Sequence, residues 1–274
     1  MAGLLSYFAT SLLYALLAAY FWRTHWRSTN QARTPHTTKI QQLEKTAILL
    51  PLLLHTFLLY QSIWVDQGLN LGVGNAVSAI VWLAVLIYWI ASFRYNLEGL
   101  QALVLGVACA SVLLPVVLPV AHRLPYTQLP AFKAHLLVAL LAYSLFTIAA
   151  LHALLMAIVE RRLHSGVAMF ANLPPLLTME NLLFRIIAAG FILLTLTLAS
   201  GILFSEELFN KPIQFNHKTL FALISWAIFA ALLIGRKIYG WRGRVAIRWT
   251  LSGFAALLLA YVGSKFILEI ILRR

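Results

Sequence analysis

The sequence predicts an all-α membrane protein, a polytopic transmembrane helical bundle of about eight spans with both termini on the outer side. Of its 274 residues, 62% are hydrophobic and only 11% are charged, whereas soluble domains carry about 25% charged residues. Long runs contain no Lys, Arg, Asp or Glu, and a helix needs roughly 20 apolar residues to cross a bilayer. Basic residues, in addition, concentrate in every second connection between these runs.

The first four spans follow from charge-free runs separated by polar, Gly-rich or Pro-rich connections. The third run follows the segment DQGLNLGVGN, and the fourth leads into PVAHRLPYTQLP. A helix satisfies its backbone hydrogen bonds within its own segment, as lipid requires, whereas a membrane strand would alternate apolar and polar residues over about ten positions. The predicted helices cover residues 3–22, 46–65, 74–93 and 100–121.

The last four spans are predicted in the same way. Residues 134–159 and 186–205 are free of charge, and the two final runs are shorter but continue with apolar residues. Segment 160–181 contains Pro174 and Pro175 and predicts an interfacial loop that ends in a helix start at Thr178, with Glu180 in the first turn. The predicted helices cover 132–159, 182–204, 216–235 and 247–271, and residues 1–274 form a single transmembrane domain.

The distribution of Lys and Arg predicts the orientation. The connections after spans one, three, five and seven hold fourteen basic residues, and the three opposite connections hold four. The positive-inside rule places the first set in the cytoplasm and therefore both termini outside. The net charge of +13 is then mainly a topology signal, with added attraction to anionic membrane lipids. No nucleic acid partner is expected, because the chain has no basic soluble module.

Few residues suggest catalysis or redox chemistry. The sequence contains no recognisable nucleophile–base pair or carboxylate dyad, so we expect no enzymatic activity. Cys109 is the only cysteine, which excludes an internal disulfide and the Cys-x-x-Cys-His attachment of a c-type cytochrome. No basic segment precedes the first span, so a cleaved signal peptide is not expected.

Histidine is the most informative residue type. His135 opens the fifth span and His217 opens the seventh, so both are expected at the outer surface, where Lys133 and Lys218 also lie. Imidazole is a common metal ligand and a usual axial ligand of haem iron, and basic groups suit the haem propionates. The alternative is that these imidazoles only form hydrogen bonds between helices or contact water. His55 lies midway along the second span, roughly 15 Å from either end.

Three stretches resemble the integral membrane family of cytochrome c assembly proteins. The first is His135-Leu-Leu-Val-Ala-Leu-Leu-Ala-Tyr143, which is similar to the family's outer His followed by Tyr at a helix start. The second is LPPLLTMENLLFRIIAAGFILLTLTLASG (173–201), and the third is the run from His217 to Phe254. The match covers about 130–265 and extends weakly through His55. It is strongest to the short HemX- and YpjD-type inner membrane relatives of the CcsA-type proteins.

The chain also departs from the family pattern. CcsA-type proteins have a Trp-rich outer segment before the seventh of these helices, and here residues 205–216 contain no Trp. A second outer His beyond the last helix is absent, and Gly235 stands where the family has a His. His217 stands where the family has Pro, so a ligand role for His217 does not follow from the resemblance. His55 matches the intramembrane His of the short relatives.

The resemblance implies a multi-pass protein of the bacterial inner (plasma) membrane that binds or handles haem at the outer face and assists cytochrome c maturation. His135 is the expected axial ligand, with His55 as a further cofactor-binding candidate. On residue chemistry and position alone, His217 is the candidate second metal ligand, and Lys133 and Lys218 are the candidate propionate partners. The expected partners are haem, membrane lipids and either cytochrome maturation proteins or another membrane protein. The alternative function is that of a non-catalytic accessory or regulatory subunit of such a membrane protein.

Overall fold

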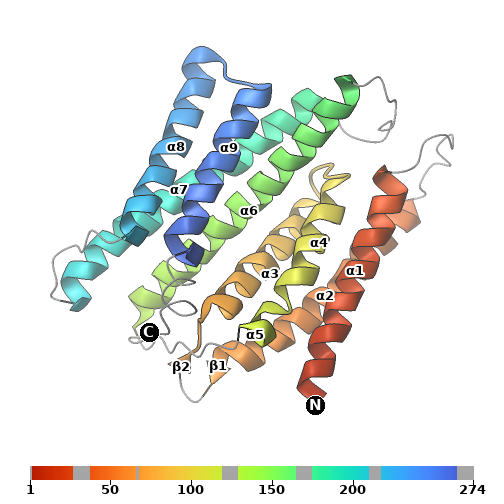
Figure 1. Cartoon of the computed structure of the whole chain (residues 1–274), viewed down its shortest axis with the longest axis horizontal. Helices are drawn as coiled ribbons and strands as arrows, with labels where there is room; N and C mark the ends of the chain where they lie inside the picture. The colour runs from red at the N-terminus through yellow and green to blue at the C-terminus, as the bar shows by residue number, and fades with distance from the viewer. Residues whose placement is uncertain are drawn as a thin grey trace.

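The computed structural model describes residues 2–26, 38–65, 68–118, 129–164, 175–209 and 217–263. Eight helices in these ranges are long and apolar enough to cross a membrane, which confirms the predicted helical bundle. The start of the first helix and the short strand pair lie at the same end of the bundle (Figure 1). The elements are α1 (Ala2–Trp26), α2 (Thr38–Ile63), β1 (Trp64–Val65), β2 (Gly68–Leu69), α3 (Val73–Ala91), α4 (Leu100–Ser111), α5 (Leu114–Val117), α6 (Pro130–His164), α7 (Leu176–Phe209), α8 (His217–Tyr239), α9 (Gly243–Leu258) and the π-helix η1 (Leu259–Gly263).

Helix α6 joins two groups of helices. Helices α1 to α4 lie on one side of α6, where α3 and α4 contact it. Helices α7, α8 and α9 lie on the other side, where α7 and α9 contact it (Figure 1). Helices α6 and α7 form the most extensive pair. Their close approach requires Gly190, because a Cβ there would lie 3.2 Å from the ring of Phe146. The Phe146 ring also stacks on Phe229 of α8, with the ring centroids 4.0 Å apart.

Serine hydroxyls connect helices across the bundle. Ser144 of α6 donates to the Ile80 carbonyl of α3 at 2.8 Å, and Ser225 of α8 donates to the Gly253 carbonyl of α9 at 2.9 Å. Ser11 of α1 donates to the Cys109 carbonyl of α4 at 2.9 Å. Small polar residues suit such contacts because they let backbones approach and still satisfy their own hydrogen bonds in an apolar environment.

The structure differs from the sequence prediction mainly at span ends. The predicted fourth span, 100–121, divides at residues 112–113 into α4 and the short α5, whose first turn contains Pro115. Proline lacks a backbone N–H and its ring clashes with the preceding turn, so it favours a helix start over a continuous helix. Helices α6 and α7 extend beyond their predicted limits, and the helix predicted to start at Thr178 begins at Leu176. The predicted end of the last span, 264–271, lies outside the described residues.

The end of α8 is closed by a turn at a left-handed glycine. Gly240 has a φ of 66°, and the N–H of Trp241 donates to the Gly235 carbonyl at 3.2 Å. A left-handed glycine just after the last turn ends many helices, and here the closing bond reaches one residue further back than the bond of the Schellman motif. The Trp241 ring then folds back onto Gly235, where an added Cβ would lie 2.4 Å from the ring. Gly235 is therefore required by this packing, which also explains why the family's His is not accommodated at that position.

We predict that Gly235→Ala destabilises the protein by about 1–3 kcal/mol, because the Trp241 ring must move. Gly106→Ala is the matched control, since nothing lies within 4 Å of an added Cβ at this helical glycine. That change should be neutral or stabilise by up to ~1 kcal/mol. Thermal unfolding in mild detergent measures both, and equal midpoints for the two variants would contradict the packing described here.

Candidate functional site

His135 lies on the second turn of α6 and faces the last turns of α7. Its Nδ1 is 2.8 Å from the Ser200 hydroxyl. That hydroxyl donates its single proton to backbone carbonyls of its own helix, those of Leu196 at 2.7 Å and Thr197 at 3.1 Å. Assigning the Ser200 proton to one of these carbonyls makes Ser200 the acceptor of the His135 Nδ1–H, and in this assignment Nε2 carries the lone pair. This is the tautomer that coordinates a metal through Nε2.

The same contact fixes the direction of the imidazole. Across the helix interface the ring lies against Gly201, where an added Cβ would be 3.5 Å from the His135 Cε1 atom. Metal-binding histidines characteristically donate their second ring N–H to a neighbouring oxygen, which holds the ring in place and increases its basicity as a ligand. Ser200 of α7 is such an oxygen partner for His135, so the packing of α6 on α7 positions the imidazole ring.

His217 and the two candidate lysines lie at the same end of the bundle as His135 (Figure 1). His217 is exposed at the first residue of α8, Lys133 is exposed and Lys218 is partly exposed. No hydrogen bond or ring contact joins His217 to His135 within the part of the chain that is described. The convergence of the two imidazoles on one ligand therefore stays a prediction. The other basic residues predicted on the outer side, Arg123 and Lys211, lie outside the described residues.

His55 is completely buried between α1, α2 and α3. Its Nε2 is 2.8 Å from the Ser78 hydroxyl, and its Nδ1 is 3.4 Å from the Tyr14 hydroxyl. The two bonds are compatible if Tyr14 donates to Nδ1 and Nε2 donates to Ser78. Both ring nitrogens are thus used in contacts between helices, so the structure favours a structural role for His55 over the predicted role in cofactor binding.

The sequence analysis did not single out the buried ion cluster at the other end of the bundle. Glu180 in the first turns of α7 accepts hydrogen bonds from Arg236 of α8 and, at 3.2 Å, from the backbone N–H of Gly243. Arg242 Nε also lies 3.2 Å from the carboxylate. Arg236 further contacts the Phe184 ring, with 4.7 Å between the guanidinium carbon and the ring centroid. The cluster joins α7, α8 and α9. In the sequence it was indicated only by an acidic residue, Glu180, in the second family stretch and by Arg236 in the third.

An apolar groove of about 280 Å³ runs between α2, α3 and α6 near the β1–β2 pair. Leu136, Leu137 and Leu140 form its α6 wall, and helical spacing places these residues on the face of α6 turned away from His135. The groove and the imidazole are therefore on opposite faces of one helix. Within the described ranges, no cluster of three or more His, Cys, Asp or Glu side chains could hold a metal ion.

Comparison with known proteins agrees with this architecture. The sequence profile of the family described as "Cytochrome C assembly protein" matches residues 47–272. The chain is 29% identical over 207 residues to "Inner membrane protein YpjD" of Escherichia coli K12, covering 75% of this chain and 78% of that protein. It is 36% identical over 86 residues to "Cytochrome c biogenesis protein CcsA" of Synechocystis, covering 31% of this chain and 26% of that protein. The eight apolar helices and the first relative identify a multi-pass inner membrane protein.

We predict that Glu180→Gln lowers stability by about 2–3 kcal/mol. This is less than the ~3–5 kcal/mol expected for a fully buried pair, because the Arg236 side chain is 21% exposed while that of Glu180 is 7% exposed. Glu160→Gln is the control: its partner Arg244 is 63% exposed, and exposed pairs contribute ~1 kcal/mol or less. A midpoint of thermal unfolding that falls equally in both variants would show that burial of the cluster is unimportant.

Proposed function

The chain belongs to the cytochrome c assembly protein family, and from this membership we propose that it binds and handles haem during cytochrome c maturation, at the membrane surface where α6 begins. Membership of the family supports a role in cytochrome c maturation. The observation that carries the haem proposal is the hydrogen bond from His135 Nδ1 to Ser200, because it leaves the Nε2 lone pair in the tautomer that ligates iron.

In this proposal His135, which α7 holds in position, would ligate the haem iron. His217 would be the second ligand, and Lys133 and Lys218 are the candidate partners of the two propionates. Charge-assisted bonds from ammonium groups to carboxylates are stronger than neutral hydrogen bonds. Lys218 follows His217 directly, whereas Lys133 precedes His135 by two residues and so starts from the opposite face of α6, which makes Lys218 the better placed propionate partner. When bound, haem would supply an iron centre; the protein residues bind and orient it. We propose no catalytic step.

The competing function is that of an accessory subunit of another membrane protein. It requires the same fold, but the imidazole of His135 would have only a structural role in it. The two functions therefore differ in one respect that can be measured directly, which is whether the purified protein contains haem that depends on His135.

We predict a Soret absorption band in protein purified in mild detergent from haem-replete cells. His135→Gly should lower the haem content roughly tenfold or more, because the loss of an axial ligand exceeds the ~1.4 kcal/mol that a tenfold change in affinity represents. Added imidazole should restore the band by replacing the missing ring.

Two controls accompany this measurement. The elution profile and the unfolding midpoint of His135→Gly should stay near those of the wild type. His55→Gln should keep the band, because that buried ring is assigned to contacts between helices. The proposal would be abandoned if the wild type showed no band even after haemin addition, or if His135→Gly retained a normal band. A partner that co-purifies with unpigmented protein would then favour the accessory role.

A further inference from the structure

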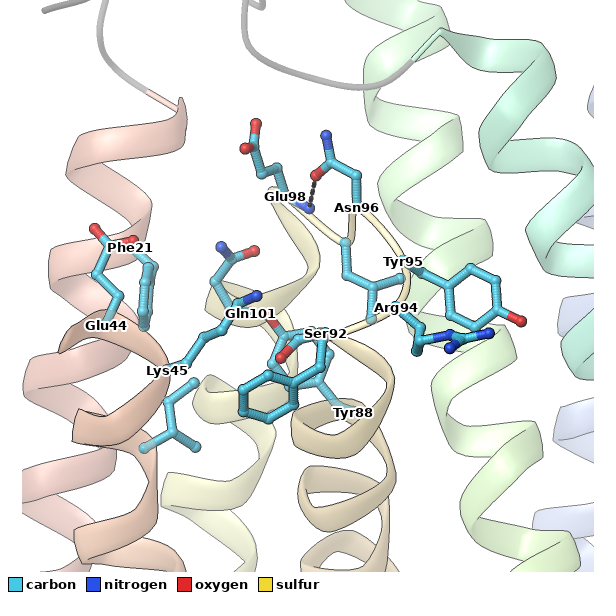
Figure 2. Close-up of a pocket in the computed structure, with 13 residues that line it drawn as sticks. Phe21, Glu44, Lys45, Tyr88, Ser92, Arg94, Tyr95, Asn96, Glu98 and Gln101 are labelled. Atoms are coloured by element: carbon cyan, nitrogen blue, oxygen red, sulfur yellow. Dashed lines mark hydrogen bonds between the residues drawn. The ribbon is translucent and has the colours of Figure 1, made fainter. Parts of the chain in front are cut away.

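A polar hollow of about 290 Å³ lies at the end of the bundle away from the first turn of α6 (Figure 2). Its walls come from the end of α1, the beginning of α2, the end of α3 and the turn into α4. Its volume is far larger than the ~10–15 Å³ that a single water requires. The hollow can therefore hold a small polar molecule or part of a larger one.

The hollow lies at the depth of lipid head groups. The apolar spans of the first four helices end or begin here, at Thr24, Gln42, Ala91 and Leu100. Side chains from these ends, rather than from mid-span positions, form its polar lining. A ligand in it would thus sit where the membrane changes from hydrocarbon to head groups.

Two side chains in its lining are nine-tenths buried and lack partners. Tyr88 is 4% exposed, and within the described residues its hydroxyl makes no hydrogen bond. Gln101 is 6% exposed, and its buried amide oxygen has no donor in the described part of the chain. Buried polar groups are normally hydrogen-bonded because an unmet one is costly. The Gln101 amide oxygen is in this state, and the Tyr88 hydroxyl lies at the same hollow, so a polar ligand there would complete both.

The charges around the hollow have both signs. The Lys45 ammonium lies over the Phe93 ring, 5.0 Å from its centroid, and no carboxylate among the described residues pairs with it. Glu44 accepts from Tyr20 at 3.0 Å, and Glu98 also lines the hollow. A ligand that matches this lining carries an anionic group and a cationic group together.

Figure 2 shows how these side chains are directed. Lys45 and Gln101 point toward the space between α2 and α4, Glu44 lies at its edge beside Phe21, and Arg94 and Tyr95 point away from it toward α6. Apart from Arg94, the charged residues of the lining are two carboxylates, those of Glu44 and Glu98, and one ammonium, that of Lys45. This excess favours a ligand with its own N–H-bearing cation over a purely anionic one.

We propose that the hollow binds a phosphate–ammonium zwitterion of the phosphoethanolamine type. The Lys45 ammonium and the Tyr88 hydroxyl hold the phosphate, and the carboxylates of Glu44 and Glu98 with the Gln101 amide oxygen accept hydrogen bonds from the ligand ammonium. The same chemistry is present in a phosphatidylethanolamine head group and in soluble O-phosphoethanolamine. The site is remote from His135, so it does not depend on the haem proposal.

The test is thermal unfolding of the full chain in three lipid environments. Nanodiscs of phosphatidylcholine are compared with nanodiscs containing phosphatidylethanolamine or phosphatidylglycerol, and O-phosphoethanolamine is added separately to delipidated protein in detergent. Phosphatidylcholine is the informative reference because its ammonium has no N–H to donate. Tyr88→Phe and Lys45→Met remove the proposed contacts. Tyr95→Phe and Lys237→Met are the matched controls, because Tyr95 points away from the hollow and Lys237 lies in the last turn of α8, outside its lining.

Phosphatidylethanolamine should raise the midpoint by several degrees over phosphatidylcholine, and phosphatidylglycerol should not. The increase should disappear in Tyr88→Phe and Lys45→Met and remain in both controls, which would identify the lipid as the source. An increase with O-phosphoethanolamine that shows the same dependence on the variants would support the site with a soluble ligand. The proposal is overturned if neither ligand raises the midpoint, or if the increase persists in Tyr88→Phe and Lys45→Met.

Discussion

The pairing of α6 with α7 is the constraint on which the candidate site depends. Near one end His135 donates to Ser200, and near the other His152 donates from Nε2 to the Met179 carbonyl at 2.9 Å. Between these points Gly190 lets the Phe146 ring into the interface. Because apolar contacts with lipid and with protein are similar, such packing and hydrogen bonds set the register of membrane helices. That register directs the His135 ring.

The buried charged side chains also depend on how α7 packs against its neighbouring helices. A carboxylate within a membrane protein is costly unless it is paired. Glu180, near the beginning of α7, is paired with two arginines and accepts from a backbone N–H. Phe184 covers the face of Arg236, which adds a cation–π contact to the ion pair. The cluster fixes α8 and α9 against α7, while the glycine turn at the end of α8 brings Trp241 into place.

Most of the fold was predictable from the sequence because hydropathy and helix length suffice to identify spans. The break before α5 followed from Pro115, although the run of apolar residues concealed it. The hydrogen-bond partners of the histidines were not predictable. Nothing near His135 in the sequence indicates Ser200, and only the structure shows that both ring nitrogens of His55 contact Ser78 and Tyr14. The link from Glu180 to Arg236 also spans distant segments, so its geometry appears only when α7 and α8 are packed together.

The central claim is that the His135 imidazole coordinates haem iron. Pulsed electron paramagnetic resonance of the ferric, haem-loaded protein, produced with ¹⁵N-labelled histidine, tests it most directly. Our account predicts hyperfine couplings from the coordinated imidazole nitrogens of His135 and His217, and the His135 coupling is missing when His135→Gly is loaded with haem without added imidazole. An unchanged coupling in that variant, or no histidine coupling in the wild type, would contradict it.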